Sequence, residues 1–169
     1  MHGRNDEYGG GGMELEVDVK DRILKEYDQA VTPLMEFLPW LEQHSGRDSY
    51  TMYGSEGISE HSLGFPVYDA NLMRFVKKAE KTSLMDRNYR YVFTRNRLQS
   101  HEAERILIQQ ATWREWGQLK GIFSRYILEG KVKGRIWSEG VKEDIFYLVL
   151  LKMQEIVQTW GKRTEIAEV

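Results

Sequence analysis

The residue types that could do chemistry are densest between positions 87 and 97, where arginines alternate with aromatic side chains. Arginine recognises phosphate through two parallel hydrogen bonds, and aromatic rings offer faces on which bases stack. If the segment is helical, one face carries Arg87, Arg90, Tyr91, Thr94 and Arg95, and Arg97 closes the segment. The other side of that helix, with Tyr89, Val92 and Phe93, is expected to point toward the core.

A second basic segment could extend this patch, because it carries Arg125, Lys131, Lys133 and Arg135. Two interpretations stay open: the cations bind phosphate, or they form a solvated face that pairs with acidic parts of the chain. The sequence pI of about 6.1 favours the second, since a nucleic-acid-binding domain usually has a pI above ~9.

Tryptophan is frequent in this chain, with 5 residues among 169. Trp, Tyr and Arg are the types enriched in binding hot spots. Most of the tryptophans fall on apolar helical stripes and are expected in the core. Trp113 and Trp137 lie off those stripes and are candidates for a contact surface.

Catalytic and metal-binding motifs are missing from the sequence. The chain has no cysteine, which excludes a thiolate nucleophile and every Cys-containing metal site. His101 and Glu102 begin like a zinc-protease motif, but position 105 is arginine where that motif needs histidine. Neither a phosphate-binding Walker loop nor a nucleophile elbow is present. His44 and His61 are expected to be exposed loop residues rather than metal ligands.

Two groups of carboxylates lie near expected helix starts. They are Glu102 with Glu104, and Glu139 with Glu143 and Asp144. Negative side chains stabilise the positive end of a helix dipole, and this explains them without catalysis. We therefore expect no catalytic residue, no metal and no cofactor.

Charge is segregated along the chain. Residues 1–66 hold 5 basic and 13 acidic side chains, residues 67–135 hold 15 and 7, and residues 136–169 hold 4 and 6. Such asymmetry points to a charged partner, unless the acidic and basic segments pack side by side and neutralise each other.

The elements that must position these residues are mostly helical. Apolar spacing predicts helices over 19–31, 33–43, 84–99 and 102–110, and a further helix that begins after an Asp69 cap. Another helix is expected to run from the Thr112 capping box to Gly130. A helical turn is expected at 134–141, followed by a helix from Asp144 to Gly161. Residues 44–66 are punctuated by glycine, which favours a short hairpin or an ordered loop. The expected fold class is mainly α (α+β): a compact, bundle-like helical domain with a small β-hairpin or loop insertion around residues 47–66.

The domain organisation follows from composition. We expect a disordered Gly-rich leader at 1–12, one helical domain at 13–161 and a polar tail at 162–169, with Met13 as the natural start. The longest apolar stretch, residues 145–151, is far shorter than the ~20 residues of a membrane span, and no signal-peptide pattern opens the chain. We expect no membrane association and a cytoplasmic location.

Three segments together resemble domain-of-unknown-function family 6508, small bacterial proteins frequent on mobile elements. The segments are Phe37–Glu42, Phe65–Asp69 running into Phe75 and Val76, and Gly134–Trp137 leading to Ile145–Met153. Lys131–Lys133 stands where members often have an acidic-Arg-Phe triplet. The family has no established activity, so the resemblance implies an accessory protein of phage or conjugative-element origin.

These observations lead to three functional hypotheses. The first is a non-catalytic protein-interaction or regulatory protein whose partner is a protein. One specialisation of this hypothesis is an inhibitor of a host-defence nuclease complex. The second is a nucleic-acid-binding protein that uses residues 87–97. The third is a hydrolase with an unrecognised site. Oligomeric state is not indicated by the sequence.

Overall fold

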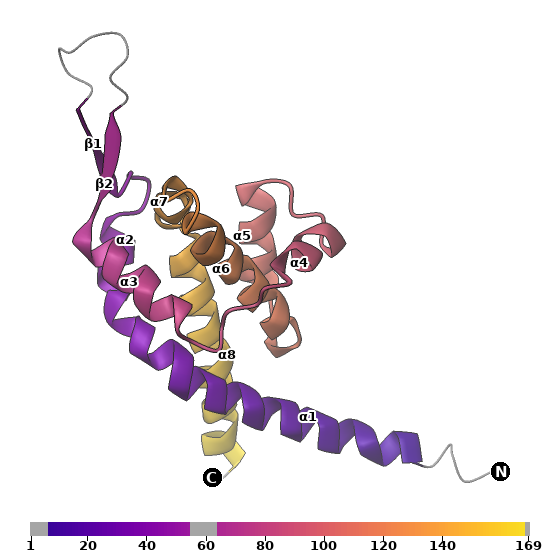
Figure 1. Ribbon diagram of the computed structural model, residues 1–169. Coiled ribbons are helices and arrows are strands. Elements are labelled where there is room, and N and C mark those ends of the chain that lie inside the picture. Colours follow the sequence, from indigo (N-terminus) through magenta and orange to yellow (C-terminus); the bar gives the residue numbers. More distant parts are fainter. Residues whose placement is uncertain (1–6, 55–63, 168–169) are drawn as a thin grey trace.

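Helix α6 (Trp116–Gly130) lies at the centre of the fold, because apolar or small side chains cover most of its circumference. The computed structural model describes the backbone of residues 7–54 and 64–167, and the side chains of residues 16–54 and 64–160 (Figure 1). Helices α3 (Ala70–Glu80), α4 (Tyr89–Arg95), α7 (Arg135–Lys142) and α8 (Ile145–Ala167) all contact α6. The expected mainly helical domain is confirmed.

Aromatic rings from three of these helices meet in the core. Phe75 of α3, Phe123 of α6 and Phe146 of α8 contact one another edge to face, with centroids 5.1–6.0 Å apart. Tyr126 adds a fourth ring 6.0 Å from Phe146. All four side chains are fully buried, so edge-to-face packing and lost water contact both hold these helices together.

The N-terminal helices follow one path whose helical type changes at the prolines. Helix α1 (Glu7–Glu26) passes into a π-helical turn (Tyr27–Val31), a 3₁₀ helix (Thr32–Phe37) and α2 (Leu38–Gln43). Pro33 lies in the first turn of the 3₁₀ segment, as expected, since proline cannot donate a backbone hydrogen bond. Just before it, Thr32 donates to the carbonyl of Tyr27 through both its backbone N–H and its Oγ1, the latter at 3.2 Å.

The helical backbone extends beyond both boundaries that the sequence predicted for the domain. Of the expected leader, residues 1–6 lie outside the described residues, and the backbone of residues 7–12 belongs to α1. At the other end, α8 continues past Gly161, where the sequence placed its end, to Ala167. Within the described residues, no helix combines the length and apolar character that crossing a membrane requires.

Three helix caps expected from the sequence are confirmed. Asp69 accepts from the backbone N–H of Asn71 at 2.7 Å, and Ser100 starts α5 (His101–Gln110) by accepting from Ala103 at 3.1 Å. The capping box of Thr112 and Glu115 opens a 3₁₀ turn (Trp113–Glu115) that continues into α6. The hydrogen bonds from Thr112 hold the pKa of Glu115 below its usual range.

The helix expected over residues 84–99 is wrong in extent, since α4 spans only Tyr89–Arg95. Before it, Ser124 Oγ of α6 donates to the Leu84 carbonyl at 2.9 Å and accepts from the Asp86 N–H at 2.7 Å. These bonds hold the preceding loop in a non-helical path. After it, Arg97 adopts a left-handed conformation with φ 53°, which ends the helical run.

A two-stranded antiparallel sheet forms the expected hairpin. Strand β1 (Tyr50–Tyr53) pairs with β2 (Phe65–Tyr68), and the hairpin projects from the helical body (Figure 1). Its base is tied to α7, because the buried Ser138 Oγ accepts from the Ser49 N–H at 2.8 Å. The Tyr68 ring also packs edge to face on Trp137, 6.1 Å away.

Two glycines of α6 provide a test of this packing. A Cβ at Gly121 would lie 2.6 Å from Val92 of α4, whereas a Cβ at Gly117 would meet nothing within 4 Å. We expect Gly121→Ala to lower the free energy of unfolding by about 1–3 kcal/mol, as overpacking does. Gly117→Ala on the same helix should raise it by up to about 1 kcal/mol, since alanine is the better helix former. Urea denaturation measures both, and equal effects would contradict the close α4–α6 contact.

Candidate functional site

The predicted arginines of residues 87–97 lie on the surface around α4. Arg87, Arg90, Arg95 and Arg97 are exposed, and the Tyr91 side chain is 63% exposed. Arg95 donates to the Tyr91 hydroxyl at 2.8 Å and lies over its ring. Tyr89 is buried, while Val92 and Phe93 are half-buried against α6, as the helical pattern predicts.

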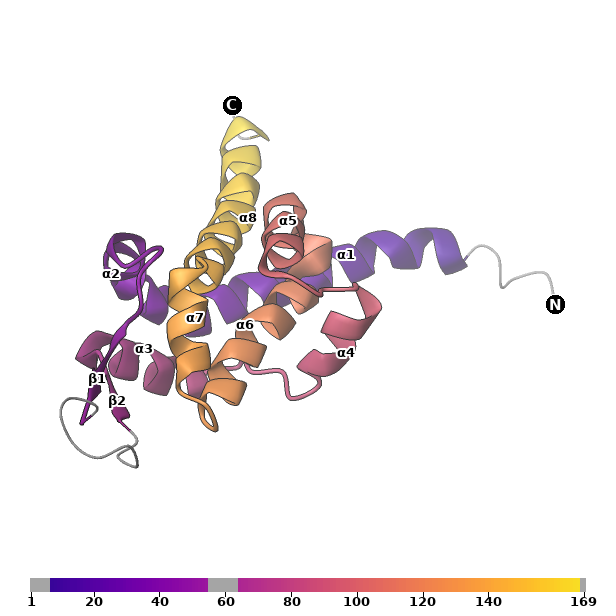
Figure 2. The same ribbon diagram turned by 90° about the horizontal axis from the view of Figure 1, so that it is seen from above.

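The second basic segment lies elsewhere, in the turn between α6 and α7. Lys131 forms an ion pair with Glu80 at the end of α3, and Lys133 is exposed. Arg135 lies over the Tyr50 ring of β1, 5.6 Å from its centroid. Arg125 points into a cavity instead. The two views place α4 and the hairpin at opposite sides of the body (Figures 1 and 2). The predicted patch is therefore divided between two regions.

The two candidate tryptophans are both half-buried and packed. Trp113 carries the Arg114 guanidinium 4.8 Å above its ring. Trp137 donates its indole N–H to the Ile127 carbonyl at 2.8 Å and fits over Gly130. Trp137 thus has a packing role between α6 and α7.

The acidic N-terminal segment neutralises only part of the basic segment. Glu36 pairs with Arg74 and Lys78, and Glu26 pairs with Lys120. By contrast, none of the four arginines around α4 pairs with a carboxylate in the part of the chain that the structure describes. Their charges remain available to a partner.

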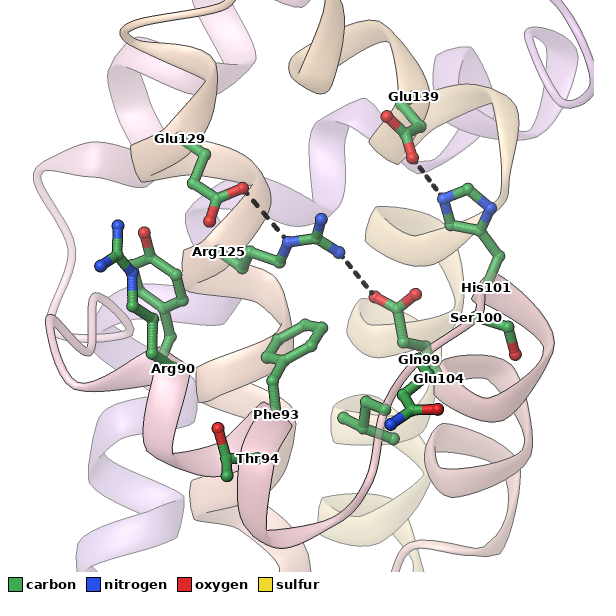
Figure 3. A pocket seen from close by; sticks show the side chains of 12 residues that line it. Arg90, Phe93, Thr94, Gln99, Ser100, His101, Glu104, Arg125, Glu129 and Glu139 are labelled. Carbon is green, nitrogen blue, oxygen red and sulfur yellow. Dashed lines mark hydrogen bonds and ion pairs between the residues drawn. The ribbon is translucent and has the colours of Figure 1, made fainter.

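A polar cavity of about 620 Å³ opens between α4, α5, α6 and α7 (Figure 3). Arg125 of α6 reaches into it and links two carboxylates: its Nε donates to Glu129 at 3.2 Å, and its Nη1 lies 3.7 Å from Glu104. The guanidinium packs on the rings of Phe93 and Tyr126, 5.0 and 5.1 Å from their centroids. The charged group is thus held by ion pairs and aromatic faces together.

Glu104 is the most deeply buried ionisable group of this cavity, with 2% of its surface exposed. Its Oε1 accepts a hydrogen bond from the Tyr126 hydroxyl at 2.8 Å. Burial raises the pKa of Glu104 above its ordinary value, although Tyr126 and Arg125 act in the opposite direction. Burial and the neighbouring carboxylate also raise the pKa of Tyr126.

His101 joins the cavity to α7. Its Nε2 is hydrogen-bonded to Glu139, and its Nδ1 lies 3.9 Å from Glu143 Oε2. Arg105 donates to the same Glu143 oxygen at 3.0 Å. Because its two ring nitrogens face carboxylates of Glu139 and Glu143, His101 links α5 to α7 and the turn that follows it.

The sequence pattern missed this site, because its residues come from distant segments. His101 and Glu104 are three positions apart on one face of α5, which is the one local signal that was present. Glu139 reaches the same cavity only through the packing of α7 on α6. The helix-dipole explanation accounts for where Glu104 lies in its helix, but it does not account for its burial.

No metal centre is found among the described side chains. His44 stacks on Trp40 with centroids 4.4 Å apart, and His61 lies outside the described residues. In residues 16–54 and 64–160, no cluster of three or more His, Asp or Glu suits a metal ion.

The hairpin presents a second distinctive surface. Its outer face, formed by Thr51, Tyr53, Phe65 and Val67, is exposed throughout, and Phe65, Tyr53 and Val67 are 59%, 53% and 46% accessible. The Tyr53 and Phe65 rings lie side by side, with centroids 6.4 Å apart. The opposite face, with Tyr50 and Tyr68, packs toward Arg135 and Trp137.

Among the described residues, none pairs with the outer edge of either strand, and the two edges differ. The Asp69 N–H donates to Ser49 at 2.9 Å, so in this register Thr51–Val67 and Tyr53–Phe65 are the hydrogen-bonded pairs. The backbone groups of Met52 and Pro66 therefore point outward, away from the partner strand. Because proline has no N–H, the β2 edge lacks a hydrogen-bond donor at Pro66, whereas the β1 edge keeps the N–H of Met52.

Comparison with known proteins adds no assignment, because no family model matches the chain and no curated protein or solved structure is significantly similar to it. The resemblance to family 6508 stays a hypothesis.

Burial of Glu104 predicts a pH-dependent stability difference. Its raised pKa means that ionisation opposes folding: the penalty is absent below the unfolded pKa and complete above the folded one. Glutamine still accepts from Tyr126 but carries no charge. Glu104→Gln should therefore gain stability relative to wild type as pH rises from 4 to 8, by ~1.4 kcal/mol for each unit of pKa shift.

Urea unfolding at pH 4, 6 and 8 measures this difference. Glu102→Gln, an exposed neighbour in the same helical turn, is the control and should show no such trend. A difference between Glu104→Gln and wild type that stays constant with pH would contradict a raised pKa.

Proposed function

We propose that this is a non-catalytic protein-interaction protein that binds its partner through the hairpin. The observation that carries this proposal is the exposed outer face beside the outer edge of β1, with which no described residue pairs. Three large apolar side chains on one small face (Tyr53, Phe65 and Val67) are more than a monomer needs to expose, and such patches mark interaction sites.

Strand addition is the binding mode that fits this geometry. An extended segment of a partner can pair with the outward backbone groups of β1, including those of Met52, while its side chains cover the outer face. An isolated two-stranded hairpin is only marginally stable in water, and a third strand would complete it. The attachment to α7 through Ser49 and Tyr68 supports this role, because it holds the hairpin in place before binding.

Site-specific photocrosslinking in the source cells tests this proposal. A photoreactive residue at Thr51 should crosslink a distinct protein, while the same residue at the exposed Thr159 of α8 should not. The identified protein is then purified for binding measurements.

Substitutions then locate the interface by calorimetry. Met52→Pro removes an outward N–H and mirrors Pro66, so it should leave the hairpin paired but weaken binding at least about tenfold. Phe65→Ser should also weaken binding, because it removes apolar surface that the partner would cover. Val17→Ser is the matched control, because Val17 is 56% exposed and lies on α1 rather than beside the strands. Unchanged affinity in both hairpin variants would contradict the proposal.

A second candidate function rests on the arginines around α4. Their exposed, unpaired guanidinium groups and the exposed Tyr91 favour nucleic-acid binding. If they contact phosphates, the anisotropy of a labelled oligonucleotide should rise on binding at 50 mM salt and much less at 200 mM, since each contact adds about −0.9 to the log–log salt slope.

Charge-removing variants separate this candidate from general electrostatic attraction. Arg90→Gln with Arg95→Gln should abolish most of the anisotropy change, whereas Lys77→Gln on α3 should not. Absence of any change with wild-type protein at 50 mM salt would exclude the nucleic-acid function and leave the hairpin proposal unaffected.

A further inference from the structure

The cavity of Figure 3 contains three carboxylates that each engage only one oxygen within the protein. Glu104 uses Oε1 for Tyr126 and Arg125, Glu129 uses Oε2 for Arg125, and Glu139 uses Oε1 for His101. Among the described residues, no hydrogen bond or ion pair reaches the other oxygen of any of the three. Three acceptor oxygens thus face one cavity without donors.

The Glu104 side chain is almost completely buried, but its second oxygen is not among the buried side-chain atoms that lack a hydrogen-bond partner. The carboxylate projects toward the space between Arg125 and His101 (Figure 3), so this oxygen is accessible from the cavity that Glu104 lines. A group with hydrogen-bond donors that occupies this space can therefore bind this oxygen.

The charges of the lining select the class of ligand. Three carboxylates face Arg125 and His101, while Arg90 lies at the edge and points away from them (Figure 3). An anion would therefore meet three carboxylates that share one arginine and one histidine, and a neutral molecule would add no positive charge. A cation with several N–H donors satisfies both the charge and the acceptors.

The structure also shows that these surroundings accommodate a guanidinium. Arg125 places one between two carboxylates and against the faces of Phe93 and Tyr126. The cavity volume of about 620 Å³ lies within the range of small-molecule sites, and Phe93 and Leu98 offer apolar surface for a carbon chain.

We propose that this cavity binds a small organic cation with a guanidinium or primary ammonium group, placed against the free oxygen of Glu104. Glu129 and Glu139 are the flanking acceptors. The cation can belong to a free amine or to an arginine or lysine side chain of a peptide. This proposal is independent of the hairpin, which lies on the other side of the body (Figure 2).

Isothermal titration calorimetry with agmatine, which carries a guanidinium and an ammonium on a four-carbon chain, tests the proposal. Agmatine should bind wild-type protein saturably, and 1,4-butanediol, the uncharged analogue of its chain, should not. A blocked Gly-Arg-Gly peptide identifies the source: tighter binding of the peptide points to a protein side chain, and tighter binding of agmatine to a free amine.

Three variants assign the site. Glu104→Gln and Glu139→Gln should each weaken agmatine binding at least tenfold, while Glu102→Gln, exposed on the same helix, should not change it. Circular dichroism establishes that each variant is folded; if Glu104→Gln is not, Glu129→Gln takes its place, because Glu129 is partly exposed. The proposal is overturned by absence of agmatine binding, by equal binding of the diol, or by wild-type affinity in the folded cavity variants.

Discussion

The enclosure of α6 is the constraint on which the rest of the structure depends. A helix with apolar residues on most of its surface must be covered on most sides, and α3, α4, α7 and α8 cover it. Each close approach needs a small residue at the contact: Gly121 lies under Val92, and Gly130 lies under Trp137. Ser124 adds a polar contact that fixes the loop before α4. The positions of α4 and α7, and hence the space between them, follow from the side chains of one central helix.

That space is polar because the residues that line it combine ion pairs with partial burial. Arg125 and Glu129 belong to α6 itself, whereas Glu104 and Glu139 come from helices that pack around it. Burying a carboxyl such as Glu104 opposes folding unless donors compensate, and here Tyr126 and Arg125 compensate one oxygen only. Our proposal places the donors of a bound cation at the other oxygen, which is accessible from the cavity.

The two faces of the hairpin differ in how much they contribute to the packing of the fold. Its inner face is fixed by Tyr68 on Trp137 and by the Ser49–Ser138 hydrogen bond, so its direction is set by α7. Its outer face contributes little to the core, since Tyr53 and Phe65 stay largely exposed. The fold therefore carries two separate features, an exposed strand face on the hairpin and a cavity lined by charged residues beside α4 (Figure 1). Our two binding proposals rest on these features separately.

Local patterns in the sequence determined the helical class and the caps at Asp69, Ser100 and Thr112, because these depend on neighbours within one or two turns. They left a hairpin or a loop open for residues 44–66, and strand pairing decided between them. Local spacing also indicated which side of α4 faces the core. The start of α4 was set by Ser124, which is distant in sequence and holds the loop before it, so it lay beyond any local pattern. In the same way, only tertiary packing separated Arg135 from the arginines of α4 and brought His101, Glu104, Arg125 and Glu139 to one cavity. The physical reason is that helix periodicity fixes the face on which a side chain lies, while the neighbour of that face is set by how the helices enclose α6.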